Sequence, residues 1–67
     1  MKKYELTTDT IKLGDKTLYR IRRLSDGLLG GLVESEDNLS HNGDCFVYDN
    51  ARVLGDARVS GDARIYD

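Results

Sequence analysis

His41 is the residue of this sequence best suited to acid–base chemistry, because an imidazole changes its protonation state near neutral pH. It is the only histidine among 67 residues. The sequence contains none of the motifs that accompany a catalytic histidine in many enzymes: no phosphate-binding glycine loop, no metal-ligand cluster and no nucleophile motif. We therefore expect no catalytic residues and no enzymatic activity, and we interpret His41 as a structural histidine in a partly covered position.

Carboxyl and amide side chains recur at every sixth position, at Asp44, Asn50, Asp56 and Asp62. Oxygen ligands of this kind suit calcium. Asp and Asn are also the usual residues of tight turns, which explains the series without a metal. Cys45 is the single cysteine, so no internal disulfide can form, and one thiol with one imidazole does not make a zinc site. We expect a buried Cys45, no metal and no cofactor.

Positive charge is concentrated near the N-terminus. Residues 1–23 hold seven Lys and Arg against three Asp and Glu, whereas residues 24–67 hold three against nine. Such a basic region could bind an acidic protein surface or, as an alternative, a nucleotide or a nucleic-acid backbone. Alternation along a strand would place the arginines on two opposite faces rather than on one. An alternative is therefore that these side chains are simply hydrated at the surface, or that they contact the acidic half of a second copy. The candidate partner-binding residues are Lys2, Lys3, Tyr19, Arg20, Arg22 and Arg23.

The C-terminal half is built from six-residue rows, read as GDCFVY, DNARVL, GDARVS and GDARIY. In each row a small residue and an aliphatic one lie two positions apart, so alternation puts both on one face and the intervening arginine on the other. The Gly-Asp or Asp-Asn pair supplies a corner. This pattern predicts a coil of very short parallel strands.

Three six-residue sides would close a turn of about 18 residues, so that each residue lies over the one about 18 positions later. The register predicts a set of contacts between successive turns: Glu34 with Arg52 as an ion pair, Phe46 with Arg64 as a cation–π pair, Val47 with Ile65 in the core, and Tyr48 with Tyr66 as an aromatic pair.

The first thirty residues differ from the rows that follow them. Residues 3–7 and 17–24 alternate as strands do, with a turn at Gly14–Asp15 and a Gly-rich link into the repeats. We expect residues 1–30 to form a hairpin cap across one end of the coil formed by residues 31–67, because an exposed coil end leaves backbone groups unpaired.

The chain resembles the YdcK-like hexapeptide-repeat proteins of bacteria and their prophages. The resemblance lies in the segments GGLVESEDNLS, GDCFVYDNARV and GDARVS, and in the N-terminal segment Lys-Tyr-Glu-Leu. The resemblance implies a left-handed parallel β-helix. It also implies an enzymatic alternative, since hexapeptide-repeat acyltransferases use a histidine on such a scaffold. Leu32 stands where that family often has an aromatic residue. The expected fold is all-β: a single domain, residues 1–67, with a short left-handed β-helix of about two coils and an N-terminal β-hairpin cap.

The sequence stops at Asp67 in mid-pattern, so we expect the far end of the coil to bury itself against a second copy in a two-fold homodimer. The residues predicted at that end are Tyr48, Arg64, Ile65 and Tyr66. No segment is apolar enough for a membrane span or a signal peptide, which favours the cytoplasm, or the host cytoplasm for a phage-encoded protein.

The function expected from these features is that of a non-catalytic protein-binding module. The resemblance to prophage proteins suggests a phage-type accessory or inhibitory protein that binds a host complex, for example a defence complex, in fixed stoichiometry. The alternatives are a β-helical assembly module and the remnant of a hexapeptide-repeat acyltransferase.

Overall fold

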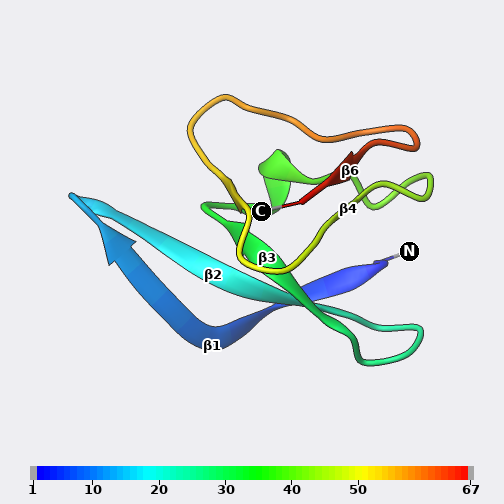
Figure 1. Ribbon diagram of the computed structural model, residues 1–67, viewed down its shortest axis with the longest axis horizontal. Helices are drawn as coiled ribbons and strands as arrows, with labels where there is room; N and C mark the ends of the chain where they lie inside the picture. Colours follow the sequence, from blue (N-terminus) through cyan, green and yellow to red (C-terminus); the bar gives the residue numbers. More distant parts are fainter. Residues whose placement is uncertain (1, 67) are drawn as a thin grey trace.

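The computed structural model describes residues 2–66, which form a small all-β protein (Figure 1). Its strands are β1 (Tyr4–Leu13), β2 (Lys16–Arg23), β3 (Leu29–Val33), β4 (Phe46–Val47), β5 (Arg52–Val53) and β6 (Arg64–Ile65). A single turn of 3-10 helix, η1 (Glu36–Asn38), is the one helical segment in this range. No helix within residues 2–66 has the length and apolar character needed to cross a membrane.

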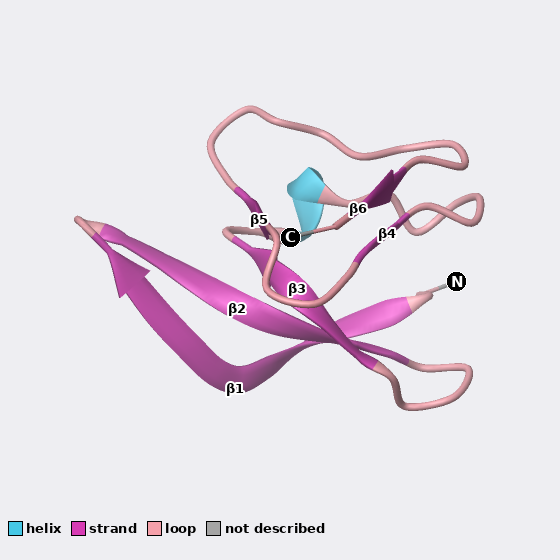
Figure 2. Ribbon diagram, viewed as in Figure 1, coloured by secondary structure: helices cyan, strands magenta, loops and turns pink. Residues whose placement is uncertain are grey.

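β1 and β2 form a long antiparallel hairpin, as the sequence predicts (Figure 2). Tyr4 lies opposite Arg23, and Leu13 lies opposite Lys16. The turn between them places Gly14 at a φ of 65°, a conformation that glycine adopts without steric conflict. The pairing shifts between Leu6 and Thr10, and β1 bends at its middle there (Figure 1).

β3 joins the hairpin to the second half of the chain. It pairs antiparallel with β2 and parallel with β5, so the sheet order is β1-β2-β3-β5. Because β3 pairs on both sides, the hairpin is not a cap across the end of a coil. It is instead the antiparallel part of a mixed four-stranded sheet.

Residues 51–65 form a second layer against residues 32–47 through three short parallel pairings. β5 pairs with β3, β6 pairs with β4 as a separate two-stranded sheet, and Val59 forms an isolated bridge with Leu39. The corners of this layer are similar turns in which the amides of Ala51, Ala57 and Ala63 bond the carbonyls of Tyr48, Leu54 and Ser60. Asp49, Gly55 and Gly61 take positive φ in these turns, which confirms the predicted corner chemistry.

The predicted left-handed β-helix of about two coils is nevertheless wrong. Residues 2–66 form a mixed sheet dominated by antiparallel pairing, plus a two-stranded parallel pair, and they contain no regular coil. The offset between paired residues is 18 for Phe46 with Arg64 but 20 for Leu32 with Arg52 and for Leu39 with Val59. The change arises between Leu39 and Phe46, which are seven residues apart, whereas their partners Val59 and Arg64 are five residues apart, so the corner at residues 40–45 is two residues longer than its counterpart in the second layer.

The individual contacts predicted from the 18-residue register have mixed outcomes. Val47 pairs with Ile65, and the rings of Tyr48 and Tyr66 stack with centroids 4.8 Å apart, so both predictions are confirmed. Phe46 does pair with Arg64, but the guanidinium over its ring, 5.1 Å from the centroid, belongs to Arg23.

The predicted ion pair between Glu34 and Arg52 is wrong. The Glu34 carboxylate instead accepts hydrogen bonds from the Gly55 amide at 2.7 Å and from Lys16 at 3.3 Å. The Gly55 bond is the first cause of a lowered pKa of Glu34. The shifted offset of β5 accounts for the error, because it places Arg52 beside Leu32.

The hydrophobic core lies between the mixed sheet and the parallel segments. Cys45 is fully buried in it, as predicted. Gly30 and Gly31 lie under the second layer at very close range, since a Cβ on Gly31 would come within 2.5 Å of the Ala51 carbonyl oxygen. The core residues are Tyr4, Ile21, Val33, Leu39, Cys45, Phe46, Val47, Ala51, Val53 and Val59.

Candidate functional site

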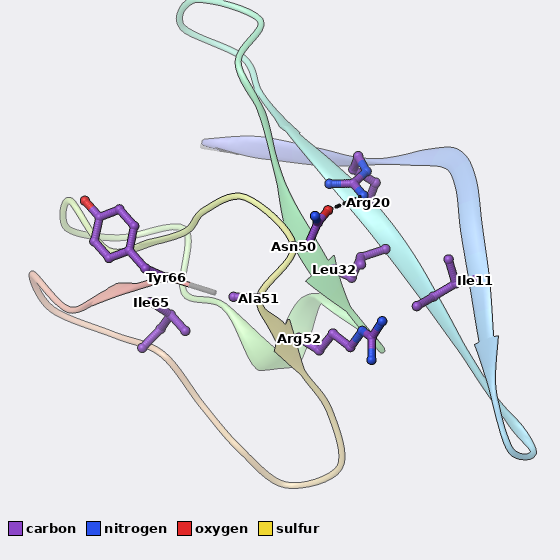
Figure 3. Close-up of a pocket in the computed structure, with 8 residues that line it drawn as sticks. All are labelled: Ile11, Arg20, Leu32, Asn50, Ala51, Arg52, Ile65 and Tyr66. Carbon is purple, nitrogen blue, oxygen red and sulfur yellow. Dashed lines mark hydrogen bonds between the residues drawn. The ribbon is translucent and has the colours of Figure 1, made fainter.

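Arg20 lies at the centre of the predicted basic cluster, yet its guanidinium is used inside the chain. It donates to the carbonyls of Gly30 at 2.7 Å and Asp49 at 3.0 Å, to Asn50 at 3.1 Å (Figure 3) and to Asp9 at 3.2 Å. The side chain therefore connects β2 with β3 and with the Asp49–Asn50 turn. A partner would have to displace several of these bonds to bind it.

The other predicted partner-binding cations are also engaged. Lys3 donates to the Cys45 carbonyl at 2.5 Å and to the Gly43 carbonyl at 3.1 Å, and Lys2 pairs with Glu36 at 3.3 Å. Arg22 pairs with Glu5, Arg23 pairs with Asp26, and Tyr19 is half-buried. The six predicted residues thus do not form one open basic surface, although the side chain of Arg22 keeps 51% exposure.

His41 lies beneath the first residues of β1. The Lys3 amide donates to its Nδ1 at 3.0 Å, so its proton belongs on Nε2, which donates to Glu36 Oε1 at 2.8 Å. The imidazole also stacks on the Tyr4 ring with centroids 4.1 Å apart. Both ring nitrogens have partners, and this favours the structural interpretation of His41 over acyl transfer.

Tyr4 is fully buried beside this histidine and donates its hydroxyl proton to the Leu39 carbonyl at 2.5 Å. Burial, followed by the charge of Glu36, raises the pKa of Tyr4 from 10.0 to about 12. The folded state holds this proton more tightly than the unfolded chain does. The contribution of Tyr4 to stability is therefore complete below pH 10 and is lost as the pH rises through 12.

We expect the free energy of unfolding to decrease more steeply between pH 10 and 12 in the native protein than in a Tyr4→Phe variant. The other titrating groups are the same in both proteins, so the difference in slope isolates this hydroxyl. Urea denaturation at a series of pH values measures it. Parallel curves for the two proteins would contradict the burial of the Tyr4 hydroxyl.

The acidic series does not gather into a metal site. Asp44, Asn50, Asp56 and Asp62 are all exposed, and Asn50 accepts a hydrogen bond from Arg20. Within residues 2–66 no three His, Cys, Asp or Glu side chains lie close enough together to hold a metal ion. The geometry is that of the predicted turns.

An open groove of about 590 Å³ lies where the second layer meets the sheet (Figure 3). Arg20 turns toward Asn50 at one side of it, and Arg52 reaches outward from β5. The described lining of this groove includes two arginines and an asparagine but no acid and no thiol. Its lining residues are Ile11, Arg20, Leu32, Asn50, Ala51, Arg52, Ile65 and Tyr66.

Residues 24–29, which we call the leucine loop, form a surface that the sequence interpretation missed. Leu24, Leu28 and Leu29 are 48%, 40% and 57% exposed, and the loop projects from the sheet between β2 and β3 (Figure 1). The sequence interpretation treated this stretch only as the end of a strand and a Gly-rich link into the repeats. The sequence feature that indicates this surface is the pair of adjacent leucines in Asp26-Gly27-Leu28-Leu29-Gly30, a segment rich in turn residues.

The leucine loop is closed by hydrogen bonds within itself despite its exposure. Arg23 donates to both carboxylate oxygens of Asp26, at 3.1 and 2.7 Å, and Asp26 also accepts from the Leu28 amide at 3.1 Å. These bonds, with that of Arg23 first, lower the pKa of Asp26 to about 2. Backbone bonds between Arg23 and Leu28 and between Gly27 and Arg23, both 2.8 Å, close the loop.

Asn38 is a second residue that the sequence interpretation missed. Its side-chain oxygen accepts from the amides of Glu34 and Ser35, and its nitrogen donates to the carbonyls of Gly55 and Ala57 at 3.2 and 2.8 Å. It is 1% exposed and is the one buried polar or charged residue in the described range. Asn38 thus joins η1 to the second layer.

Comparison with protein-family models finds no match to this chain, and comparison with curated proteins finds none.

Proposed function

We propose that this chain is a non-catalytic protein-binding module and that the leucine loop is its binding element. The observation that carries the proposal is the combination of exposed leucines and a hydrogen-bonded loop in residues 24–29. Three leucines between 40% and 57% exposed lie on a loop closed by five hydrogen bonds around Arg23 and Asp26. Apolar side chains grouped in this way are typical of protein–protein contacts.

The energetics favour docking by such a loop. Complete burial of a leucine side chain contributes ~1.5–3 kcal/mol, and each of these leucines has roughly half of that still to gain. A loop that is already ordered loses little conformational entropy on binding. The three leucines alone would support only weak binding, so the partner must also contact the neighbouring strands.

The residues around the leucine loop indicate what kind of partner would bind it. Leu29 lies opposite Arg22 in the register of β2 and β3, and the Arg22 side chain is half-exposed. A protein with an apolar cleft bordered by carboxylates would cover the leucines and compete with Glu5 for this guanidinium. An acidic protein partner therefore fits better than a nucleic acid, since most of the other N-terminal cations are already paired.

The test is affinity capture from a bacterial lysate with the native protein, Leu28→Asp and Leu13→Asp. Leu13 is the matched control, because it is also 40% exposed but lies at the far end of the hairpin. We expect a protein retained in about 1:1 ratio by the native chain and by Leu13→Asp, and lost with Leu28→Asp. Capture that Leu28→Asp leaves unchanged would contradict the proposal, and a nucleic acid in the retained fraction would favour the alternative.

A phage-type inhibitor of a host complex is the narrower form of this proposal. It requires that the captured protein belong to such a complex and lose activity when the chain binds. Adding the purified chain to the purified complex and measuring activity against the ratio of the two proteins would decide it. Inhibition that is complete near equimolar ratio supports the stoichiometric mechanism.

A further inference from the structure

A short series of hydrogen bonds connects His41 with the leucine loop. The backbone N–H of Lys3 donates to Nδ1 of His41 at 3.0 Å, and the carbonyl of the same residue accepts from the Leu24 amide at 2.9 Å. Leu24 is the first residue of the leucine loop. Lys3 therefore lies between a titratable ring and the candidate binding element, and a displacement of its backbone would break both bonds.

Protonation of His41 removes the acceptor on which the first of these bonds depends. An imidazole titrates between about pH 5 and pH 8, and it then carries a proton on each nitrogen. Because Nε2 already donates to Glu36, the added proton must go to Nδ1. Two N–H groups would then face each other across the 3.0 Å that separate Nδ1 from the Lys3 nitrogen. The His41 side chain is 24% exposed, so water can deliver the proton.

The charged ring would keep its place, so the Lys3 backbone is the part that must move. Glu36 Oε1 accepts from Nε2 at 2.8 Å, and a carboxylate holds a positively charged donor more strongly than a neutral one. The bond from His41 is the first cause of a lowered pKa of Glu36, so this carboxylate stays ionised. The neutral Tyr4 ring stacks on the imidazole at 4.1 Å and is itself fixed through its hydroxyl on the Leu39 carbonyl.

Other charged groups from three parts of the chain lie near this histidine. Among residues 2–66, Glu36 is the one charged side chain that bonds to the ring. Lys2 pairs with the second carboxylate oxygen of Glu36 at 3.3 Å, and the Lys3 ammonium bonds backbone carbonyls of the corner at residues 43–45. The remaining charged groups of the pocket that His41 lines are Asp37 and Arg58.

We propose that His41 is a proton-controlled switch for the leucine loop: on protonation it displaces the Lys3 backbone, breaks the bond to Leu24 and weakens partner binding. This inference rests on the proposed function, since it assigns a regulation to the same loop. Tyr4 is fully buried and stays in place, so the displacement is confined to residues 2–3 and Leu24. Loss of one backbone hydrogen bond changes an equilibrium constant by about three- to tenfold, and we expect partner binding to weaken by this factor.

The first experiment measures the switch without a partner, by NMR of the ¹⁵N-labelled protein from about pH 8 to about pH 5. We expect the amide signals of Lys3 and Leu24 to shift together with the ring nitrogens of His41, while the amide of Leu13, at the far end of the hairpin, keeps its position. His41→Asn is the matched control, because an asparagine oxygen can replace Nδ1 as acceptor and does not titrate. Its Lys3 and Leu24 signals should stay constant.

The native chain alone is sufficient to overturn the proposal. A His41 ring that titrates while the Lys3 and Leu24 amides stay unchanged would do so, and so would a ring that remains neutral down to about pH 5. Far-UV circular dichroism verifies that His41→Asn is folded.

The second experiment repeats the affinity capture at about pH 7.5 and about pH 5.5. We expect the native chain to retain about three- to tenfold less partner at the lower pH, and His41→Asn to retain the same amount at both. An equal loss in the two proteins would place the pH dependence in the partner and would overturn the regulation. No capture at either pH would contradict the proposed function, whereas the NMR result would still decide whether protonation of His41 displaces Lys3 and Leu24.

Discussion

Replacing Asn38 by aspartate is expected to unfold most of the protein at neutral pH. The substitution keeps the shape of the side chain but changes its nitrogen into an oxygen. The carbonyls of Gly55 and Ala57, which now accept hydrogen bonds at 3.2 and 2.8 Å, would then face a buried carboxylate. Each buried polar group left without a partner costs about 1–3 kcal/mol, and a charged group costs more.

The total stability of a chain of this size is small enough for this loss to be decisive. At ~0.05–0.15 kcal/mol per residue, a 67-residue protein has about 3–10 kcal/mol in all. Urea denaturation followed by circular dichroism measures the loss. Asn42→Asp, the same chemical change at an exposed position, is the control and should shift the free energy of unfolding by less than about 0.5 kcal/mol. Similar midpoints for both variants would refute the bridging role of Asn38.

Gly31→Ala is expected to separate β5 from β3. The added Cβ would lie 2.5 Å from the Ala51 carbonyl oxygen and 2.5 Å from a methyl group of Val47. That oxygen already accepts the Leu32 amide at 2.9 Å, so it cannot move away without breaking the ladder. Overpacking in a core costs about 1–3 kcal/mol, and we expect Gly31→Ala to reach the upper end of this range, because the obstacle is backbone.

Gly55→Asn serves as the control for Gly31→Ala. Gly55 takes a φ of 65° with open space around its Cα, and asparagine tolerates this left-handed conformation. We expect Gly55→Asn to cost less than about 1 kcal/mol in the same denaturation experiment. A Gly31→Ala protein as stable as Gly55→Asn would show that the second layer does not approach β3 as closely as described.

Much of the local structure could be predicted from the sequence because it depends on neighbouring residues. Alternation and the Gly14–Asp15 turn predict the hairpin, and the Gly-Asp pairs predict the corners of the last rows. Where rows follow one another without interruption, the register is also right, as in the pairs formed by Val47 and Tyr48. These features need no knowledge of distant segments.

The failures occur where distant segments decide the outcome. The corner between Leu39 and Phe46 is two residues longer than its counterpart between Val59 and Arg64, and no six-residue pattern indicates it. The role of the Asn38 amide depends on carbonyls 17 and 19 residues away. The partners of Arg20 come from three other parts of the chain, so an arginine that looks available in the sequence is occupied in the fold.

The structure divides the exposed surface into two parts with different chemistry. The leucine loop presents exposed leucines on a hydrogen-bonded turn, and it lies at the connection between β2 and β3. The last two rows instead carry exposed acids and arginines, at Asp56, Arg58, Asp62 and Arg64.

The leucine loop as binding element is the central claim, and photo-crosslinking in bacterial cells tests it most directly. A benzophenone amino acid would replace Leu28 in one variant and Leu13 in another, which gives two probes of equal starting exposure. The account predicts a discrete crosslinked product from position 28, with a protein other than the chain itself, and none from position 13. Equal crosslinking at both positions, or none at position 28, would contradict it.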